Sequence, residues 1–327
     1  MKNYCSFDDI SEIKEEILTK ALSAKTNFLK NKDLFKSKGR HLSVGLVFFN
    51  PSLRTRISSQ KAASNLGMDS VVINIQGDSW NLEFDDGVKM NGSSAEHIKE
   101  AAAVLGRYFD ILAVRSFADL KNYDTDKSEK VLNGFIKYSG VPVINLESPL
   151  GHPLQALADI MTIKEFSNRA TKPKVVLTWA PHCRALPQAV ANSFSNFTLG
   201  YELDLTIAHP AGFDLEKNFT NGAKITNNQE EAFENADFIY AKNWSSVLNY
   251  GEIGDYDAHK NWTIDTQKML LTNNAKFMHC LPVRRNLVVT DEVLDSANSV
   301  CITQAENRIW AAQTIFEELI NEVNRGN

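Results

Sequence analysis

The sequence predicts an α/β protein with two doubly wound domains, each built on a parallel sheet. Short apolar runs typical of buried strands alternate with helix-forming segments along the 327 residues, and this alternation indicates parallel strands with helices on both faces. The length suits two domains of ordinary size. We expect helices to join the domains and the last helix to pack back on the first domain. The predicted boundaries are 1–153, 154–305 and 306–327.

In the first half, a helix is expected from Asp8 or Asp9 to about Leu29. Strands are predicted at 42–49, 69–75, 111–114 and 142–146, and helices at 57–66, 95–107 and 130–138. A polar, glycine-containing loop from Gln76 to Ser94 interrupts this alternation, and a loop of that length is usually functional or disordered.

In the second half, a helix reaching from about 155 to 166 is expected to cross between the domains. Strands are predicted at 174–179, 203–208, 238–241, 276–278 and 299–302, and helices at 185–197, 229–235, 264–271, 291–296 and 306–323. Ligands bind at the carboxyl ends of strands in such sheets. Arg115 and Glu147 both follow predicted strands.

Composition excludes several classes of function. The formal net charge of −5 argues against nucleic acid as the main partner. The four cysteines, Cys5, Cys183, Cys280 and Cys301, show no C-x-x-C spacing and predict neither a disulfide framework nor a zinc site. No apolar run suits a signal core or a membrane span, so we expect a cytoplasmic protein without a membrane partner. Neither G-x-G-x-x-G nor a P-loop occurs, which argues against NAD and ATP.

The stretch Ser52-Leu53-Arg54-Thr55-Arg56 predicts an anion site. It lies between a predicted strand and a predicted helix, and the first turn of a helix offers unpaired N–H groups and the positive end of the helix dipole. Two hydroxyls and two guanidinium groups add donors suited to phosphate. The plainer interpretation is a serine cap followed by two solvated arginines.

Two later motifs carry further polar groups. Gly151-His152-Pro153-Leu154-Gln155 opens a predicted helix, with Pro153 suited to its first position. His279-Cys280-Leu281-Pro282 follows a predicted strand. Taken singly, His152 is more often a capping or core residue, and Cys280 is more often a buried thiol.

Together, S-x-R-T-R, Arg115 after a strand, H-P-x-Q and H-C-L-P resemble the transcarbamylases of the aspartate/ornithine carbamoyltransferase superfamily. The resemblance implies transfer of a carbamoyl group from carbamoyl phosphate to an amine, with no metal or organic cofactor. It makes 1–153 the carbamoyl phosphate-binding domain. It implies catalytic roles for Arg115, His152, Thr55 and Cys280. The implied carbamoyl phosphate ligands are Ser52, Leu53, Arg54, Thr55, Trp80, Arg115, His152, Gln155, Cys280, Leu281 and Arg308. Trp80 would complete the site of a neighbouring subunit in a homotrimer, or else only pack its loop.

The acceptor is read from a departure from the family pattern. Ornithine enzymes carry Asp-x-x-x-Ser-Met-Gly late in the chain, whereas the matching region here reads Tyr240-Ala241-Lys242-Asn243-Trp244-Ser245-Ser246. A lysine binds a carboxylate and not an ammonium group, so the α-nitrogen of the acceptor is expected to be acylated. This pattern resembles the N-acetyl- and N-succinylornithine transcarbamylases, and it makes 154–305 the acylornithine-binding domain.

Two positions favour the succinyl form. Acetylornithine enzymes carry a glutamate and a lysine where this sequence has Ala95 and Val288, and a glutamate would repel a succinyl carboxylate. The implied acylornithine ligands are Glu147, His182, Arg184, Lys242, Arg284 and Ala95. The expected product is N-succinylcitrulline, made for arginine biosynthesis. Three alternatives stay open: N-acetylornithine as acceptor, then ornithine or aspartate as acceptor, and a non-catalytic binding protein on the same scaffold.

Overall fold

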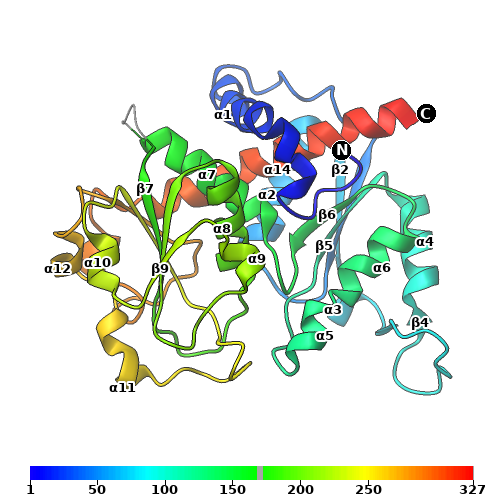
Figure 1. Ribbon diagram of the computed structural model, residues 1–327. Coiled ribbons are helices and arrows are strands. Elements are labelled where there is room, and N and C mark those ends of the chain that lie inside the picture. The colour runs from blue at the N-terminus through cyan, green and yellow to red at the C-terminus, as the bar shows by residue number, and fades with distance from the viewer. Residues whose placement is uncertain (168–171, 327) are drawn as a thin grey trace. The chain divides into compact units, whose positions relative to one another are not determined.

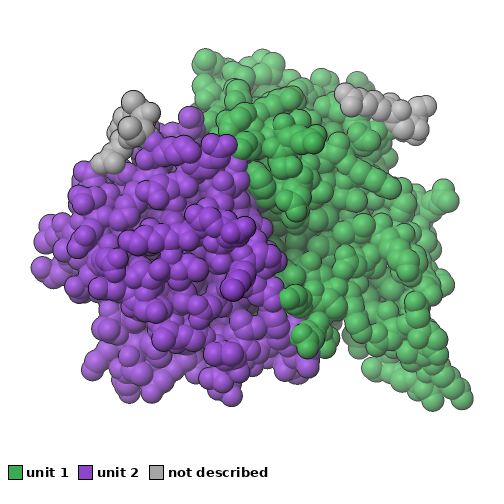
Figure 2. Space-filling view, in the orientation of Figure 1, with its two compact units in different colours: residues 1–118, 124–154, 308–327 green, residues 119–123, 155–307 purple. Residues whose placement is uncertain are grey.

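The computed structural model describes residues 1–167 and 172–326. The chain divides into two compact units (Figure 2). Unit 1 contains residues 1–118, 124–154 and the chain from Arg308 on, and unit 2 contains residues 119–123 and 155–307. The functional domain boundaries predicted above, at 153/154 and 305/306, stay a prediction.

The centre of unit 1 is a four-stranded parallel sheet in the order β2-β1-β5-β6 (Figure 1). Its strands are β1 (Ser43–Phe48), β2 (Asp69–Asn74), β5 (Ile111–Arg115) and β6 (Val143–Glu147). Strands β1, β5 and β6 are almost wholly buried, as expected for a sheet covered on both faces. The strand order reverses direction between β1 and β5, and this switch point is where doubly wound sheets bind ligands.

Helices cover the two faces of this sheet. The helices of unit 1 are η1 (Asp8–Ile13), α1 (Lys14–Lys30), α2 (Arg54–Leu66), α3 (Ile75–Asp78), α4 (Ile98–Tyr108), α5 (Tyr123–Lys127, entering from unit 2) and α6 (Lys130–Tyr138). α4 and α6 lie side by side (Figure 1), and Ile98, Leu132 and Phe135 pack in one core with Val47 and Val114 of the sheet. α2 connects β1 to β2 in the other direction, so right-handed crossovers place it on the opposite face.

Unit 2 repeats this design with a five-stranded parallel sheet in the order β11-β10-β7-β8-β9. Its strands are β7 (Lys174–Trp179), β8 (Asp204–Ala208), β9 (Lys224–Thr226), β10 (Phe238–Lys242) and β11 (Lys276–Met278). Its helices are α8 (Ala189–Gly200), α9 (Lys217–Thr220), α10 (Gln229–Phe233), α11 (Tyr256–His259), η2 (Lys260–Trp262), α12 (Thr266–Met269) and α13 (Asp291–Leu294), with most of α7 (Pro153–Phe166) and the first residues of α14 (Cys301–Gly326). The switch point lies between β7 and β10.

Two helices pass from one unit to the other. α7 begins with Pro153 and Leu154 in unit 1 and continues in unit 2, and α14 enters unit 1 at Arg308. The later part of α14 packs on α1 and α2 through the Asn65–Gln313 hydrogen bond and the Phe28–Trp310 ring contact. The expectation that the last helix returns to the first domain is therefore confirmed, as is the class of two parallel-sheet domains.

Two predicted details are wrong, and one edge strand was missed. The predicted strand at 299–302 does not form, because Ser299 makes an isolated bridge with Phe277 and α14 begins at Cys301. The edge strand β9 was not predicted, because its three residues are too short and too exposed to show a pattern. The predicted helix at 95–107 begins only at Ile98, after the two-residue strand β4 (Glu96–His97) that pairs with β3 (Leu82–Glu83). Within the described residues, no helix is long and apolar enough to cross a membrane.

Candidate active site

The first candidate site lies at the carboxyl end of β1 in unit 1. α2 begins at Arg54, so Arg54, Thr55 and Arg56 form its first turn and present the N–H groups and the dipole end expected of an anion site. The Arg54 Nε–H is buried and has no hydrogen-bond partner among the described residues. A buried guanidinium donor of this kind calls for an anionic acceptor.

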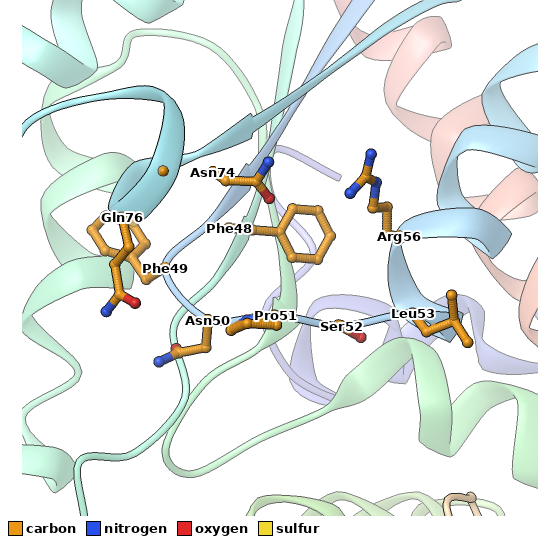
Figure 3. A pocket seen from close by; sticks show the side chains of 10 residues that line it. Phe48, Phe49, Asn50, Pro51, Ser52, Leu53, Arg56, Asn74 and Gln76 are labelled. Carbon is orange, nitrogen blue, oxygen red and sulfur yellow. The ribbon is translucent and has the colours of Figure 1, made fainter.

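A hollow of about 530 Å³ adjoins this turn (Figure 3). Its lining comes from the ends of β1 and β2, the segment between β1 and α2, the start of α2, and α3. It consists of Phe48, Phe49, Asn50, Pro51, Ser52, Leu53, Arg56, Asn74, Gln76 and Gly77. Ser52 and Leu53 therefore lie between the strand and the helix, as predicted. Arg54 and Thr55 are not part of this lining.

Arg308 joins the same turn from the far end of the chain. Its Nη2 donates a hydrogen bond to Thr55 Oγ1, and both side chains are buried. The structure thus brings together two predicted carbamoyl phosphate ligands that are 253 positions apart.

Arg115 lies at the end of β5, next to β1 at the switch point. Its Nε and Nη2 donate to Glu147 Oε2 at 3.0 and 2.8 Å, and its Nη1 lies 3.0 and 3.2 Å from the carbonyl oxygens of Asn50 and Pro51. Guanidinium carries five N–H donors, so these four contacts leave one N–H on Nη2 for a ligand.

Glu147 and His152 complete this part of the site. The Arg115–Glu147 pair is buried on both sides, and His152 Nε2 lies 3.9 Å from Glu147 Oε2. Glu147 was predicted as an acylornithine ligand, which stays a prediction, and the structure shows that it pairs with Arg115. The turn before His152 is held by Ser148, whose hydroxyl accepts from Gly151 N–H at 3.2 Å and from the Asn145 amide at 2.8 Å.

Trp80 and Ala95 belong to the segment that carries β3 and β4. The indole N–H of Trp80 donates to Glu96 Oε2 at 2.8 Å, and the ring is 56% exposed. Ala95 is exposed and its N–H bonds to Asn81 at 3.0 Å, so it precedes β4 and does not lie in a helix as predicted. A largely exposed tryptophan whose indole nitrogen is hydrogen-bonded suits contact with a further molecule.

The second candidate site lies at the switch point of unit 2. Lys242 ends β10 opposite Trp179, which ends β7, and the segment after β7 carries His182 and Arg184. Burial lowers the pKa of His182 below that of a free histidine, and the positive charges of Lys242, Arg284 and Arg184 lower it further. These four predicted acylornithine ligands therefore lie close enough to interact, and Lys242, Arg184 and Arg284 form a cationic cluster beside the His182 imidazole.

The predicted ligands Gln155, Cys280 and Leu281 also belong to unit 2. The side chain of Gln155 is 1% exposed on α7. Leu281 has a left-handed backbone (φ 55°), and its N–H donates to His279 Nδ1 at 2.9 Å. Cys280 lies beside the buried phenol of Tyr240, and burial, followed by the charge of Asp159, raises the pKa of that phenol well above its usual value.

Sequence reasoning missed Asp159 and Gln304, two fully buried polar residues next to Gln155. A signal was present for Asp159, because a carboxylate stands four positions after Gln155 in an otherwise apolar helix segment. Within the described residues, no group of three or more histidine, cysteine, aspartate or glutamate side chains could hold a metal ion.

The fold and these sites define a class. Two doubly wound units each present cationic and hydrogen-bonding side chains at a switch point, as an enzyme acting on small anionic substrates requires. Comparison with known proteins identifies the family. Residues 2–165 match the domain described as "Aspartate/ornithine carbamoyltransferase, carbamoyl-P binding domain", and residues 186–319 match "Aspartate/ornithine carbamoyltransferase, Asp/Orn binding domain". The chain belongs to the aspartate/ornithine carbamoyltransferase family.

Individual relatives narrow the resemblance. The N-succinylornithine carbamoyltransferase of Bacteroides thetaiotaomicron is 46% identical over 98% of this chain and 99% of its own length. The N-acetylornithine carbamoyltransferase of Xanthomonas axonopodis is 36% identical over 100% and 99%. A similar solved structure (TM-score 0.90, 36% identity, covering 98% of this chain and 100% of that chain) is an N-acetyl-L-ornithine transcarbamylase. It is a mutant in which alanine replaces a glutamate, and it is complexed with carbamyl phosphate and N-succinyl-L-norvaline.

Proposed function

We propose that this protein transfers the carbamoyl group of carbamoyl phosphate to the δ-amine of N2-succinyl-L-ornithine. The products are N-succinylcitrulline and phosphate, in arginine biosynthesis. The observation that carries the acceptor is the cationic cluster of unit 2, in which Lys242, Arg184 and Arg284 act together on His182. Three cations suit an acceptor with two carboxylates, and a cationic α-ammonium group would be repelled there.

The succinyl form is favoured over the acetyl form on three grounds. N-acetylornithine has one carboxylate and N-succinylornithine has two, so the second explains the extra cations. Ala95 adds no negative charge where acetylornithine enzymes carry a glutamate. The mutant acetylornithine enzyme with alanine in place of a glutamate was crystallised with a succinyl ligand, which fits this interpretation of Ala95.

The phosphate is assigned to unit 1. Ser52, Arg54, Thr55 and Arg308 supply hydroxyl and guanidinium donors, and the α2 dipole adds to them. The Arg54 Nε–H, buried without a partner among the described residues, supports this assignment. Leu53 contributes its backbone at the start of the turn.

We assign hydrogen-bond donors to the oxygen of the carbamoyl group and hydrogen-bond acceptors to its NH2 group. The remaining Nη2 N–H of Arg115, with His152 and Thr55, donates to the carbamoyl oxygen and stabilises the negative charge that develops there. Gln155 Oε1 and the Leu281 carbonyl accept from the carbamoyl NH2 group, with Cys280 beside them.

The reaction needs a neutral δ-amine, whose free pKa is close to the value of about 10.4 for lysine. Its lone pair attacks the carbamoyl carbon and forms the new C–N bond. The C–O bond to phosphate then breaks, and phosphate leaves with the electron pair and takes the proton from nitrogen. Glu147 is assigned to the ornithine portion of the acceptor. Most of the acceleration is expected from positioning and from stabilisation of the oxyanion.

We further propose a homotrimer in which Trp80 of one subunit completes the phosphate site of its neighbour. The support is the exposure of Trp80, whose indole N–H is held by Glu96.

The experiment is a product assay with carbamoyl phosphate and three acceptors in parallel: ornithine, N-acetylornithine and N-succinylornithine. Succinylcitrulline as the dominant product supports the proposal. Acetylcitrulline as the dominant product favours the first alternative, and binding of carbamoyl phosphate without any product favours a non-catalytic protein.

A further inference from the structure

A buried carboxylate on α7 organises the predicted carbamoyl-amide ligands of unit 2. Asp159 is fully buried, and it lies one helical turn after Gln155, on the same face. Its Oδ1 accepts hydrogen bonds from Gln155 Nε2 and from Gln304 Nε2, each at 2.7 Å. These distances are short for N–H···O contacts and are typical of charge-assisted bonds.

The shared acceptor determines which way both amides face. A side-chain amide donates at its nitrogen and accepts at its oxygen. Because Asp159 Oδ1 only accepts, the Nε2 atoms of Gln155 and Gln304 both face it, and their Oε1 atoms face away from it. Gln304 Oε1 then accepts the His279 N–H at 2.9 Å. Gln155 Oε1 is buried and has no partner among residues 1–167 and 172–326. A buried acceptor of this kind is costly unless a ligand N–H meets it.

A second arm leads from the same carboxylate to Leu281. Gln304 holds the backbone of His279, and His279 Nδ1 accepts the Leu281 N–H at 2.9 Å. Leu281 has a φ of 55°, a left-handed conformation that is unfavourable for a branched side chain. The hydrogen bond to His279 offsets that strain and defines the backbone at the proposed carbonyl acceptor.

We propose that Asp159 is a positioning residue for recognition of the carbamoyl NH2 group. It presents Gln155 Oε1 directly and supports Leu281 through Gln304 and His279. This inference rests on the proposed function, because it assigns both acceptors to the amide of carbamoyl phosphate. Asp159 itself does not touch the substrate.

The test compares two ligands that differ only at that amide. Acetyl phosphate has a methyl group where carbamoyl phosphate has NH2, and both carry the same carbonyl and phosphate. The variant is Asp159→Asn, whose own amide can donate to Gln155 Oε1 and so remove the preference for one orientation. Affinities are measured by calorimetric titration of the full-length protein.

We expect the preference for carbamoyl over acetyl phosphate to fall about 5- to 100-fold in D159N, the range for a buried donor, here the carbamoyl N–H, that is left without its acceptor. Affinity for acetyl phosphate should change less than about 2-fold, since its contacts do not involve the amide acceptors. An equal loss for both ligands, or an unchanged preference, overturns the proposal.

A matched control separates positioning from helix packing. Thr162 is also buried on α7 and accepts a hydrogen bond from Asn307 of α14 at 2.9 Å. Thr162→Val removes that bond without touching Gln155, and we expect an unchanged ligand preference. If T162V loses the preference as strongly as D159N, the effect belongs to packing and the proposal fails.

A second variant keeps the test decisive if D159N does not fold. Gln304→Met removes the arm to His279 and leaves the Gln155–Asp159 bond, so a smaller loss of preference, without loss of acetyl phosphate binding, is expected. No loss in Q304M refutes the second arm. The wild-type protein gives a separate check on the proposed function. If it neither binds carbamoyl phosphate nor forms product, the proposed function is wrong. If the wild type is active and D159N keeps the wild-type ligand preference, only the role of Asp159 is refuted.

Discussion

Replacing Arg115 by lysine tests whether the shape of the guanidinium, and not its charge alone, serves the reaction. Arg115 makes two contacts to Glu147 and two to the carbonyls of Asn50 and Pro51, which leaves one of its five N–H groups for substrate. A lysine has three N–H groups on one atom. It can pair with Glu147, but it cannot also reach the loop and the carbamoyl oxygen.

The expected effects on stability and activity differ in size. The buried ion pair survives in R115K, and the two lost bonds to carbonyls cost about 1 kcal/mol each. Arg115 belongs to unit 1, and for a unit of roughly 150–250 residues that loss lowers Tm by roughly 4–8 °C. Loss of an oxyanion donor lowers kcat by about 100- to 1,000-fold. The assays are thermal unfolding and the initial rate of citrulline-product formation at saturating substrates.

Two outcomes would refute this reasoning. A variant that retains more than about a tenth of wild-type kcat would show that charge alone suffices, against the geometry assigned to the Nη2 donor. Unfolding at 25 °C would show that the residue is mainly structural. The matched control is Arg107→Lys, an exposed arginine on α4, for which both measurements should stay at wild-type values.

Three further predictions concern the acceptor and the subunits. Burial, and then nearby cations, hold the pKa of His182 below the free value of 6.5. Binding of N-succinyl-L-norvaline, which neutralises those cations, should raise that pKa and take up protons below pH 6.5 but not at pH 8. Calorimetry in buffers of different ionisation enthalpy measures this uptake, and uptake that persists in His182→Asn contradicts the prediction. Ala95→Glu should lower kcat/KM for succinylornithine about tenfold or more through like-charge repulsion and shift the preference toward acetylornithine. The control Ser93→Glu should leave both values of kcat/KM unchanged. An unchanged ratio of kcat/KM for the two acceptors in Ala95→Glu refutes the role of Ala95. Arg115→Ala and Trp80→Ala should each be folded and nearly inactive. If each site uses Arg115 of one subunit and Trp80 of the next, oligomers assembled from equal amounts of the two variants should recover about a quarter of wild-type activity, because about a quarter of their sites contain both native residues. Mixed oligomers as inactive as the two variants argue against a shared site.

The sheets were predictable because their strands carry a local signal. The apolar runs at β1, β5 and β7 are buried on both faces and therefore read as continuous hydrophobic segments. The run 299–302 (Ser-Val-Cys-Ile) carries the same signal and misled the prediction. The Val300 N–H donates to the carbonyl of Phe277, as in a strand. The next residues begin α14, and the Gln304 N–H donates to the carbonyl of Val300. Tertiary packing therefore overrides β propensity at this point.

The residues of the site could be predicted from the sequence, but the hydrogen bonds and ion pairs between them could not. Arg115 and Glu147 were expected at strand ends, and both lie there. That they pair with each other depends on the register of β5 against β6, in which they stand opposite one another, and sequence alone does not say which strands are neighbours. The bond between Thr55 and Arg308 likewise requires the path of α14.

The path of α14 also has a consequence for biosynthesis. Residues 119–123 and 155–307 make up unit 2, whereas unit 1 needs the segment from Arg308 on, which supplies Gln313 to Asn65 and Glu318 to Lys20. A ribosome therefore finishes the later sheet before the helix that the earlier sheet needs has emerged. The unit translated first is completed last, and until then the surfaces of α1 and α2 that α14 covers stay exposed, which is a state prone to aggregation.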